Sequence, residues 1–293
     1  MAGKRSSYNL LSVLPHVTPR DLQLVALLDQ HRVLTTDQVH RLLFQAERTC
    51  QLRLAELRDL ALVERFRFHR PSGGTFPWHW TLGLNGHRFA AAAAGRAEPT
   101  ARAAAQLVAR MSANPHLPHL LACNEFFVRL AAHARRSPAA RLPRWWSEAR
   151  ATAEFQMVRP DGHGIWTVDE RTVGFFLECD RNTEAQRRLV GKFAAYERLA
   201  ATVGAHYPVL LWLSSPERER AVQTTLRREP PAVPVATATH DSDPAGPVWL
   251  PVHGTVRVGL HQMESSHGRA SAANPNYRDG QLHLHGDTAY PWS

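Results

Sequence analysis

The order of segments in residues 21–82 constrains the fold most, because three amphipathic helical segments are followed directly by two strands. Leu24, Val25 and Leu28 form an apolar stripe with helical spacing in the first segment. Thr35, followed three residues later by Gln38, matches a capping box at the start of the second. The helices are predicted over Asp21–Gln30, Thr36–Phe44 and about Arg48–Leu60, and the strands over Leu62–Phe68 and Phe76–Leu82.

The third helical segment indicates what this half of the chain does. Leu52, Leu54 and Leu57 are expected to face the core, which leaves one polar, arginine-bearing side. Three helices and a hairpin are the order of a winged helix-turn-helix, whose third helix enters a major groove about 12 Å wide. The alternative is an unrelated small α+β domain that binds protein. The predicted DNA contacts are Arg48, Thr49, Gln51 and Arg53 on the helix and Arg67 and Arg70 in the hairpin.

The charge of the whole chain favours an anionic partner, which we expect to be double-stranded DNA. The 293 residues carry a net charge of +9, and the pI is about 10.3. No segment reaches the ~20 apolar residues of a membrane span, and no secretory signal pattern is present, so a membrane partner is not expected. Cys50, Cys123 and Cys179 are too far apart for a zinc ribbon or a disulfide framework, which predicts a cytoplasmic protein.

Composition divides the chain into four regions. We predict a DNA-binding domain at 1–95, a linker with an Ala-rich helix at 96–116, a second domain at 117–260 and a disordered tail at 261–293. The expected fold class is α+β, and the second domain follows the order α, β, β, β, α, β. Its predicted elements are a helix over Leu120–Arg135, strands over Ala151–Val158, Ile165–Val168 and Thr172–Cys179, a helix over Asn182–Ala201 capped by Thr183, a strand over Pro208–Leu213, a helix over Glu217–Arg227 and an edge strand over Val256–Leu260.

Two carboxylates mark the ends of neighbouring predicted strands in the second domain. Asp161 opens one strand, and Glu178 closes the next one seventeen residues later. Side by side, they would form an oxygen-rich site for Mg²⁺ or Mn²⁺, which lowers the pKa of a bound water and neutralises charge on a phosphate. Lys192, on the following helix, is predicted to orient the water or the phosphate, and Glu125, on the preceding helix, to add a carboxylate. Only two of the 35 basic residues are lysines. Arginine would serve equally well on a surface, so a lysine at this position favours a catalytic role for its compact, mobile charge.

The pattern of Asp161, Glu178 and Lys192 resembles the PD-(D/E)xK nuclease superfamily, whose core has the order αβββαβ. The resemblance covers about residues 117–215 and implies a metal-dependent nuclease-like domain. The superfamily's usual lysine lies two residues after the second acid, where this chain has Asp180. Lys192 on the next helix matches a variation within the superfamily. The alternative is structural: Asp161 is a turn residue, and Glu178 and Asp180 belong to a surface set of ion pairs with Arg181, Arg187 and Arg188.

Both halves together resemble the actinobacterial replication-relaxation family of plasmids and integrative elements. The similar stretches span about residues 20–226 and include LTTDQVHRLLF, RLAELRDLALVERF, HLLACNEFFVRLAAHA, RPDG and FFLECDRNTEAQRRLVGKFAAYERL. The resemblance implies a DNA-binding protein of a mobile element, acting in plasmid replication or DNA transfer, whose partners include a second copy or other replication or transfer proteins. It leaves the enzyme question open: the protein either nicks or cleaves DNA with a divalent metal, or is a non-enzymatic transcriptional regulator or replication initiator.

Overall fold

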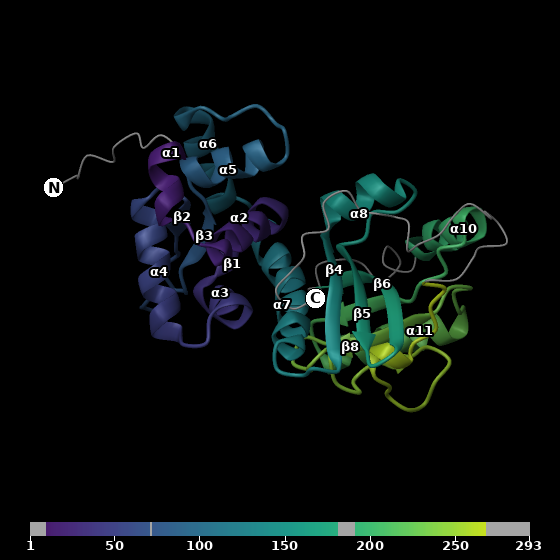
Figure 1. Cartoon of the computed structure of the whole chain (residues 1–293). Coiled ribbons are helices and arrows are strands. Elements are labelled where there is room, and N and C mark those ends of the chain that lie inside the picture. The colour runs from purple at the N-terminus through teal and green to yellow at the C-terminus, as the bar shows by residue number, and fades with distance from the viewer. Residues whose placement is uncertain (1–9, 71, 181–190, 268–293) are drawn as a thin grey trace. The chain divides into compact units, whose positions relative to one another are not determined.

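The computed structural model describes residues 10–70, 72–180 and 191–267, and these form two compact units (Figure 1). The units are Met1–Asn124 and Glu125–Ser293. The division falls inside α7 (Leu117–Ala134), whereas composition placed the start of the second domain at residue 117. None of the helices in the described part of the chain combines the length and the hydropathy needed to cross a membrane.

Side-chain caps begin the helices of the first unit. The hydroxyl oxygen of Thr18 accepts a hydrogen bond from the backbone N–H of Asp21, and the carboxylate of Asp21 accepts one from the backbone N–H of Thr18. Thr35 and Gln38 form the predicted capping box, which the structure confirms. These caps satisfy backbone groups that no helical partner can reach. The first four α-helices are α1 (Leu10–Val13), α2 (Pro19–His31), α3 (Thr36–Leu43) and α4 (Glu47–Asp59).

A small antiparallel sheet completes the first unit. β1 (Leu34–Thr35), β2 (Val63–Phe66) and β3 (His79–Leu82) lie in the order β1-β3-β2. The predicted hairpin is confirmed with shorter strands, because β2 ends at Phe66 and β3 begins at His79. Two further helices follow, α5 (Leu84–Ala93) and α6 (Ala101–Ser112), the second of which is the helix predicted in the linker.

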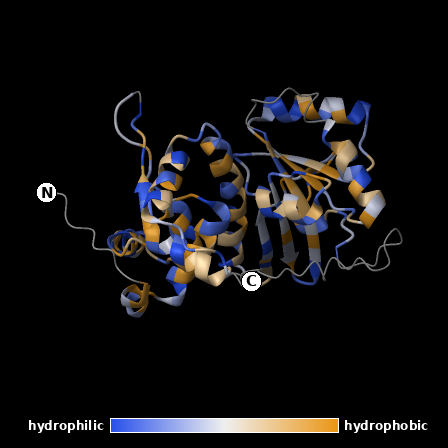
Figure 2. Cartoon of the chain, turned by 90° about the horizontal axis from the view of Figure 1, so that it is seen from above, coloured by the Kyte–Doolittle hydropathy of each residue, from blue (hydrophilic) through white to orange (hydrophobic). Residues whose placement is uncertain are grey.

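The second unit is built on a mixed sheet in the order β4-β5-β6-β7-β8-β9. β4, β5 and β6 pair antiparallel, β6, β7 and β8 pair parallel, and β9 returns antiparallel at the edge. Much of the hydrophobic colour of this unit lies on these strands (Figure 2). Their bounds are Ala140–Ser147, Gly162–Val168, Arg171–Asp180, Val209–Leu213, Val235–Thr239 and Leu250–Pro251, and the helices are α8 (Glu148–Phe155), α10 (Phe193–Val203) and α11 (Pro216–Arg228).

The strand predicted over Ala151–Val158 is wrong, because this stretch lies in and after α8. The missing strand is β4, which begins eleven residues earlier, at Ala140. Pro143 lies where the β4–β5 register shifts, and proline within a sheet is tolerated at such irregularities and on edge strands. Glu148 at the start of α8 suits the helix dipole. The order αβββαβ is therefore kept, with α8 added between the first two strands.

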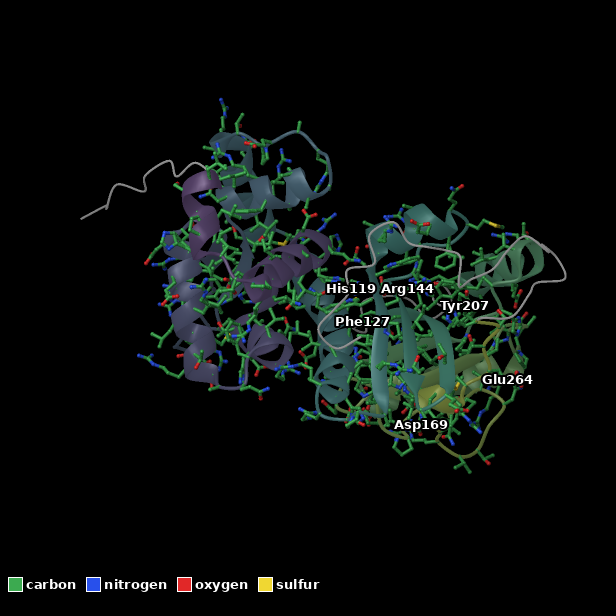
Figure 3. The ribbon with its side chains drawn as sticks, in the orientation of Figure 1. His119, Phe127, Arg144, Asp169, Tyr207 and Glu264 are labelled. Carbon is green, nitrogen blue, oxygen red and sulfur yellow. The ribbon has the colours of Figure 1, made fainter. Side chains whose placement is uncertain are left out.

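Different helices cover the two faces of the sheet. On one face, Phe127 of α7 stacks on Trp145 and Phe175. Phe127 lies beside the strands of this unit (Figure 3). On the other face, Phe155 of α8 and Tyr196 of α10 pack against Phe176. Because side chains alternate along β6, neighbouring residues of this strand belong to opposite faces.

The chain continues in ordered form beyond residue 260, so the tail predicted at 261–293 is wrong for residues 261–267. Ser265 donates a hydrogen bond to the carbonyl of Gly174 in β6, and Ser266 donates one to Gly204. The remainder of the predicted tail lies outside the described residues. The edge strand expected over Val256–Leu260 is also wrong: β9 forms the edge, and Val258 makes an isolated bridge to Trp249. The Thr183 cap and the first turns of its helix lie outside the described residues as well.

Candidate functional sites

An acidic pair lies at the end of the second unit's sheet where β5 begins and β6 ends. Gly162 pairs with Leu177 across the two strands, so Asp161 and Glu178 come opposite each other. The backbone N–H of Asp161 donates to Leu177 at 2.9 Å, and its Oδ2 accepts from the backbone N–H of Cys179 at 2.7 Å. Asp169, at the opposite end of the hairpin, marks the far end of the same strands in Figure 3. Strand pairing therefore fixes the position of Asp161 beside Glu178.

The side chain of Glu178 is held by two residues next to and within α10. Lys192, which immediately precedes this helix, places Nζ 2.8 Å from Oε2 of Glu178. Tyr196 donates its hydroxyl proton to Oε1 of Glu178 at 2.5 Å. Because Lys192 and Tyr196 are four residues apart, the start of a helix presents both to the same carboxylate. The structure thus brings together Asp161, Glu178 and Lys192, three of the four predicted catalytic residues.

Burial dominates the electrostatics of this cluster. Glu178 is 2% exposed, and its burial, followed by the nearby charge of Asp161, raises the pKa of its carboxyl to about 7, against the opposing effects of Lys192 and Tyr196. Burial and the charge of Glu178 also raise the pKa of Tyr196 well above its usual value. Lys192 differs, since 34% of its side chain is exposed. Burial disfavours the ionised form of the Glu178 carboxyl. A further cation next to Asp161 and Glu178 would therefore stabilise that form.

Asp180 has a separate partner. Its Oδ2 lies 2.5 Å from Nε of Arg218 on α11, and both side chains are buried, with exposures of 1% and 12%. The structural alternative assumed that Glu178 and Asp180 lie on the surface. Both side chains are instead buried. The predicted ion pairs with Arg181, Arg187 and Arg188 fall outside the described residues. The position that the superfamily gives to lysine is thus filled by a buried carboxylate, and the ammonium group reaches Glu178 from the helix side.

Glu125 lies on a different element from the other predicted catalytic residues. It is on α7, and it accepts a hydrogen bond from Arg129 at 2.9 Å. Arg129 also donates to the carbonyls of His240 and Ser242. α7 covers the face of the sheet that carries Phe175, whereas Glu178 belongs to the face of Phe176. The structure therefore does not place Glu125 on the face of the acidic pair, because the alternation of β6 separates the two sides.

The first unit presents most of its predicted DNA-binding residues on the surface of α4. Arg48, Thr49 and Gln51 are exposed, and Gln51 donates to Glu47 one turn earlier. Leu52 is 50% exposed, so its predicted burial is wrong. The helical period places Leu54 and Leu57 on the buried side, and Leu52 falls outside this stripe. Leu52 is therefore a large apolar side chain on the exposed side of α4, which sequence analysis missed.

Arg53 has a different environment from its neighbours on α4. Its guanidinium donates to both oxygens of Asp21, to the carbonyl of His16 and to Glu56. Asp21 is 2% exposed, so this ion pair is largely inside the unit. The hydrogen bonds to Asp21 raise the pKa of Arg53 above its usual value. These contacts tie α4 to α2, and we therefore leave Arg53 out of the proposed DNA surface.

Aromatic rings support the arginines of the β2–β3 hairpin. Arg67 lies over Trp78, with Cζ 4.3 Å from the ring centroid, and Arg70 lies over Phe76 at 5.0 Å. Gly73 and Gly74 in the tip have positive φ, which glycine tolerates and other residues rarely adopt. Sequence analysis missed Arg65, which also lies over Trp78, at 3.9 Å. The hairpin register could have revealed it, since Arg65 and Arg67 share one face of their strand.

A comparison with known protein families assigns the chain to one of them. A family model described as replication-relaxation matches residues 25–209. The chain belongs to the replication-relaxation family. No curated protein and no solved structure matches it significantly. Membership in this family suggests a role in plasmid replication or relaxation.

The part of the chain that matches the replication-relaxation family contains both candidate sites. Residues 25–209 include α3, α4 and the hairpin in the first unit and the cluster of Asp161, Glu178 and Lys192 in the second. α11, β8 and β9 lie beyond the match, and with them Arg218, the partner of Asp180. The family assignment therefore covers the acidic cluster but not the ion pair beside it.

Proposed function

We propose that this replication-relaxation protein binds double-stranded DNA through its first unit and nicks or cleaves DNA with a divalent metal in its second. The observation that carries the proposal is the convergence of Asp161, Glu178 and Lys192 at one end of a sheet. Two carboxylates and one ammonium group, each from a different element, are the groups that metal-assisted hydrolysis of a phosphodiester requires.

The arrangement of the first unit supports DNA binding. α3, the three residues 44–46 and α4 follow one another as in a helix-turn-helix, and β2 and β3 follow as its wing. The exposed side of α4 would enter the major groove, where Arg48 can reach base edges or phosphates. The hairpin would contact the backbone beside it. A net charge of +9 strengthens the attraction to DNA at long range.

The order α7, β4, β5, β6, α10, β7, with α8 inserted after β4, supports a PD-(D/E)xK-like domain. The residues present fit a hard divalent cation, because the carboxylates of Asp161 and Glu178 supply oxygen ligands. A cation beside them would oppose the burial and the charge of Asp161 that raise the pKa of Glu178. Asp161 and Glu178 would hold Mg²⁺ or Mn²⁺, which would supply a more acidic water and neutralise charge on the phosphate.

Lys192 and Tyr196 act on this site through Glu178. Each holds one carboxylate oxygen, so together they fix the orientation of the side chain. Lys192 remains partly exposed and can also approach the scissile phosphate or the attacking water, which the buried hydroxyl of Tyr196 cannot. We therefore assign Lys192 a direct role with the substrate and Tyr196 a supporting role.

The test is a nicking assay on a supercoiled plasmid that carries the cognate origin, with Mg²⁺ or Mn²⁺. Wild type should convert it to the open circular form, and Asp161→Asn and Lys192→Met should lower the rate by about 100-fold or more. Glu217→Gln is a matched control, because Glu217 is 72% exposed and pairs with Arg220 at the surface. Failure of wild type to nick with either metal, or equal nicking by Asp161→Asn, would rule out the enzymatic proposal.

The second candidate is a non-enzymatic DNA-binding regulator or replication initiator. Asp180 and its partner Arg218 favour it, since a carboxylate stands where the superfamily has its usual lysine. It predicts that operator or origin binding is unchanged by EDTA and by Glu178→Gln. The nicking assay separates the two candidates, because a regulator binds its site and leaves the plasmid supercoiled.

A further inference from the structure

One face of the β2–β3 hairpin carries a stack of two arginines on a single tryptophan. Arg65 pairs with Trp80 in the strand register, so the positions two residues further along each strand bring Arg67 across from Trp78. The guanidinium carbons of Arg65 and Arg67 lie 3.9 Å and 4.3 Å from the centroid of Trp78. Arg65 is also 5.4 Å from Trp80. Both cations therefore rest on one indole.

The opposite face of the hairpin is a separate aromatic cluster. Phe66 stacks on His79 at 5.3 Å, and Phe68 meets both rings edge-on. Residues 66 and 68 alternate with 65 and 67 along the strand, so the two sets point to opposite sides. The aromatic cluster holds the two strands of the hairpin together. The face formed by Arg65, Trp78 and Arg67 is not part of this cluster.

The stacked arginines have no acidic partner within the part of the chain that the structure describes. No carboxylate oxygen there lies within ion-pairing distance of Arg65 or Arg67, whereas Arg41, Arg53 and Arg58 of the same unit are all paired. Partial burial, followed by the charges of Arg58 and Arg67, lowers the pKa of Arg65. The stack thus concentrates positive charge without a direct ion pair among the described residues, and the nearby carboxylates of Glu64 and Asp59 offset only part of it.

We infer that Arg65, Trp78 and Arg67 form a binding site for phosphodiester groups of duplex DNA, in which Trp78 is a positioning residue. A guanidinium stacked on an indole keeps its edge N–H groups available, and its planar fork matches two phosphate oxygens. Trp78 holds both forks in place before DNA arrives, which reduces the side-chain entropy lost on binding. The inference rests on the proposed DNA binding and extends it to Arg65 and Trp78.

The alternation of cation and ring continues toward the hairpin tip. Arg70 lies 5.0 Å from Phe76, which is 43% exposed. Thr75 accepts a long hydrogen bond from Arg67 at 3.5 Å, which adds a second restraint on that side chain. Arg65 and Arg67 share one face of the hairpin, and Arg70 lies nearer the tip over a ring of its own. Spaced cations of this kind suit a backbone with regularly spaced charges.

The experiment measures binding of the full chain to a fluorescent origin duplex by anisotropy between about 50 and 300 mM salt, a range in which affinity that depends on phosphate contacts falls steeply. Trp78→Leu keeps every charge but removes the platform, and should weaken binding about 5- to 30-fold, the equivalent of two exposed cation–π contacts. Trp78→Phe restores a ring and should bind within about 3-fold of wild type. Arg65→Gln with Arg67→Gln should lower the slope of log affinity against log salt by about 2.

Arg102→Gln serves as the matched control, since Arg102 is an exposed arginine on α6 of the same unit. Arg65→Lys keeps the charge and loses the fork, and should weaken binding while Arg102→Lys does not. Circular dichroism of each variant checks that the unit stays folded. If wild type binds duplex and Trp78→Leu and Arg65→Lys bind equally well, the inference is wrong and the proposed function stands. If wild type shows no salt-dependent affinity, the proposed function itself is wrong.

Discussion

Arg67 in the first unit and Glu178 in the second show how differently the two units use charge. Arg67 is exposed and rests on a tryptophan ring, without an acidic partner among the described residues. Glu178 is 2% exposed, and both of its oxygens are hydrogen bonded. An exposed charge acts at long range and is weakened by salt. A buried charge is screened much less by salt, and its protonation depends on its burial and on the groups around it.

Arg53 is the exception that clarifies this comparison. It lies on α4 between the exposed Gln51 and Glu56, yet its guanidinium is engaged by the buried Asp21. The first unit therefore contains both kinds of charge, on one helix and within a few residues. What separates them is the side of the helix, because α2 covers only one side.

The largest expected effect separates the two sites. Asp161→Asn should lower nicking by about 100- to 1,000-fold while its affinity for the duplex stays within about 2-fold of wild type at each salt concentration. Arg67→Gln with Arg70→Gln should do the reverse, with weaker binding but an unchanged nicking rate at saturating protein. Parallel anisotropy and nicking assays measure both. Equal loss of affinity and nicking in both variants would show that the sites are not independent.

The next effect concerns the buried ion pair of the first unit. Arg53→Ala leaves the carboxylate of Asp21 buried and uncompensated, and should lower the free energy of unfolding of this unit by about 3 kcal/mol. Arg48→Ala, on the exposed side of the same helix, should change it by less than about 0.5 kcal/mol. Hydrogen exchange of α2 and α4 amides in the full chain measures both values. A large loss in Arg48→Ala would contradict the assignment of the two sides.

A glycine beside the acidic pair supports the fold of the second unit. A Cβ at Gly164 would lie 2.4 Å from the ring of Phe175 and 2.8 Å from that of Phe127. Gly164→Ala should therefore destabilise the second unit by about 1–3 kcal/mol through overpacking. Gly191→Ala is the control, because a Cβ there meets nothing within 4 Å. Hydrogen exchange of the β5 and β6 amides measures the difference, and equal protection in both variants would contradict the close packing.

The smallest effect is a difference in acid sensitivity between the units. Burial lowers the pKa of His31 to about 3 from its usual 6.5, so His31 stays neutral in the folded unit and takes up a proton on unfolding. The contribution of His31 to the free energy of unfolding is fully present above pH 6.5. It decreases as the pH falls, by about 1.5 kcal/mol at pH 5.5. Burial also lowers the pKa of His79 and His87 of the first unit, which act in the same direction.

In the second unit two groups oppose each other. Burial lowers the pKa of His163, which destabilises the unit in acid, whereas the raised pKa of Glu178 stabilises it as the pH falls below about 7. We therefore expect hydrogen exchange, corrected for intrinsic rates, to show a larger loss of protection in the first unit between pH 7.5 and 5.5. His31→Leu should reduce that loss. A larger loss in the second unit would show that His163 outweighs Glu178.

Local sequence determined the features whose partners lie close along the chain. Thr35 and Gln38 form their capping box because the interaction spans a single turn. Asp161 and Glu178 meet because their strands form a hairpin with a tight turn, so hydrophobic patterning alone placed their ends together. The same argument failed for Ala151–Val158, since alternating small and apolar residues suit a short helix as well as a strand.

Only the tertiary structure decided features whose partners are distant in the chain. Nothing in the sequence near Arg53 reveals Asp21, which lies on another helix. Likewise, Arg218 for Asp180 and Tyr196 for Glu178 depend on how helices pack over the sheet. The sequence by itself therefore determined which charged residues this protein carries and on which elements. Packing decided which of them are paired and which remain exposed, because burial depends on neighbours that no local pattern encodes.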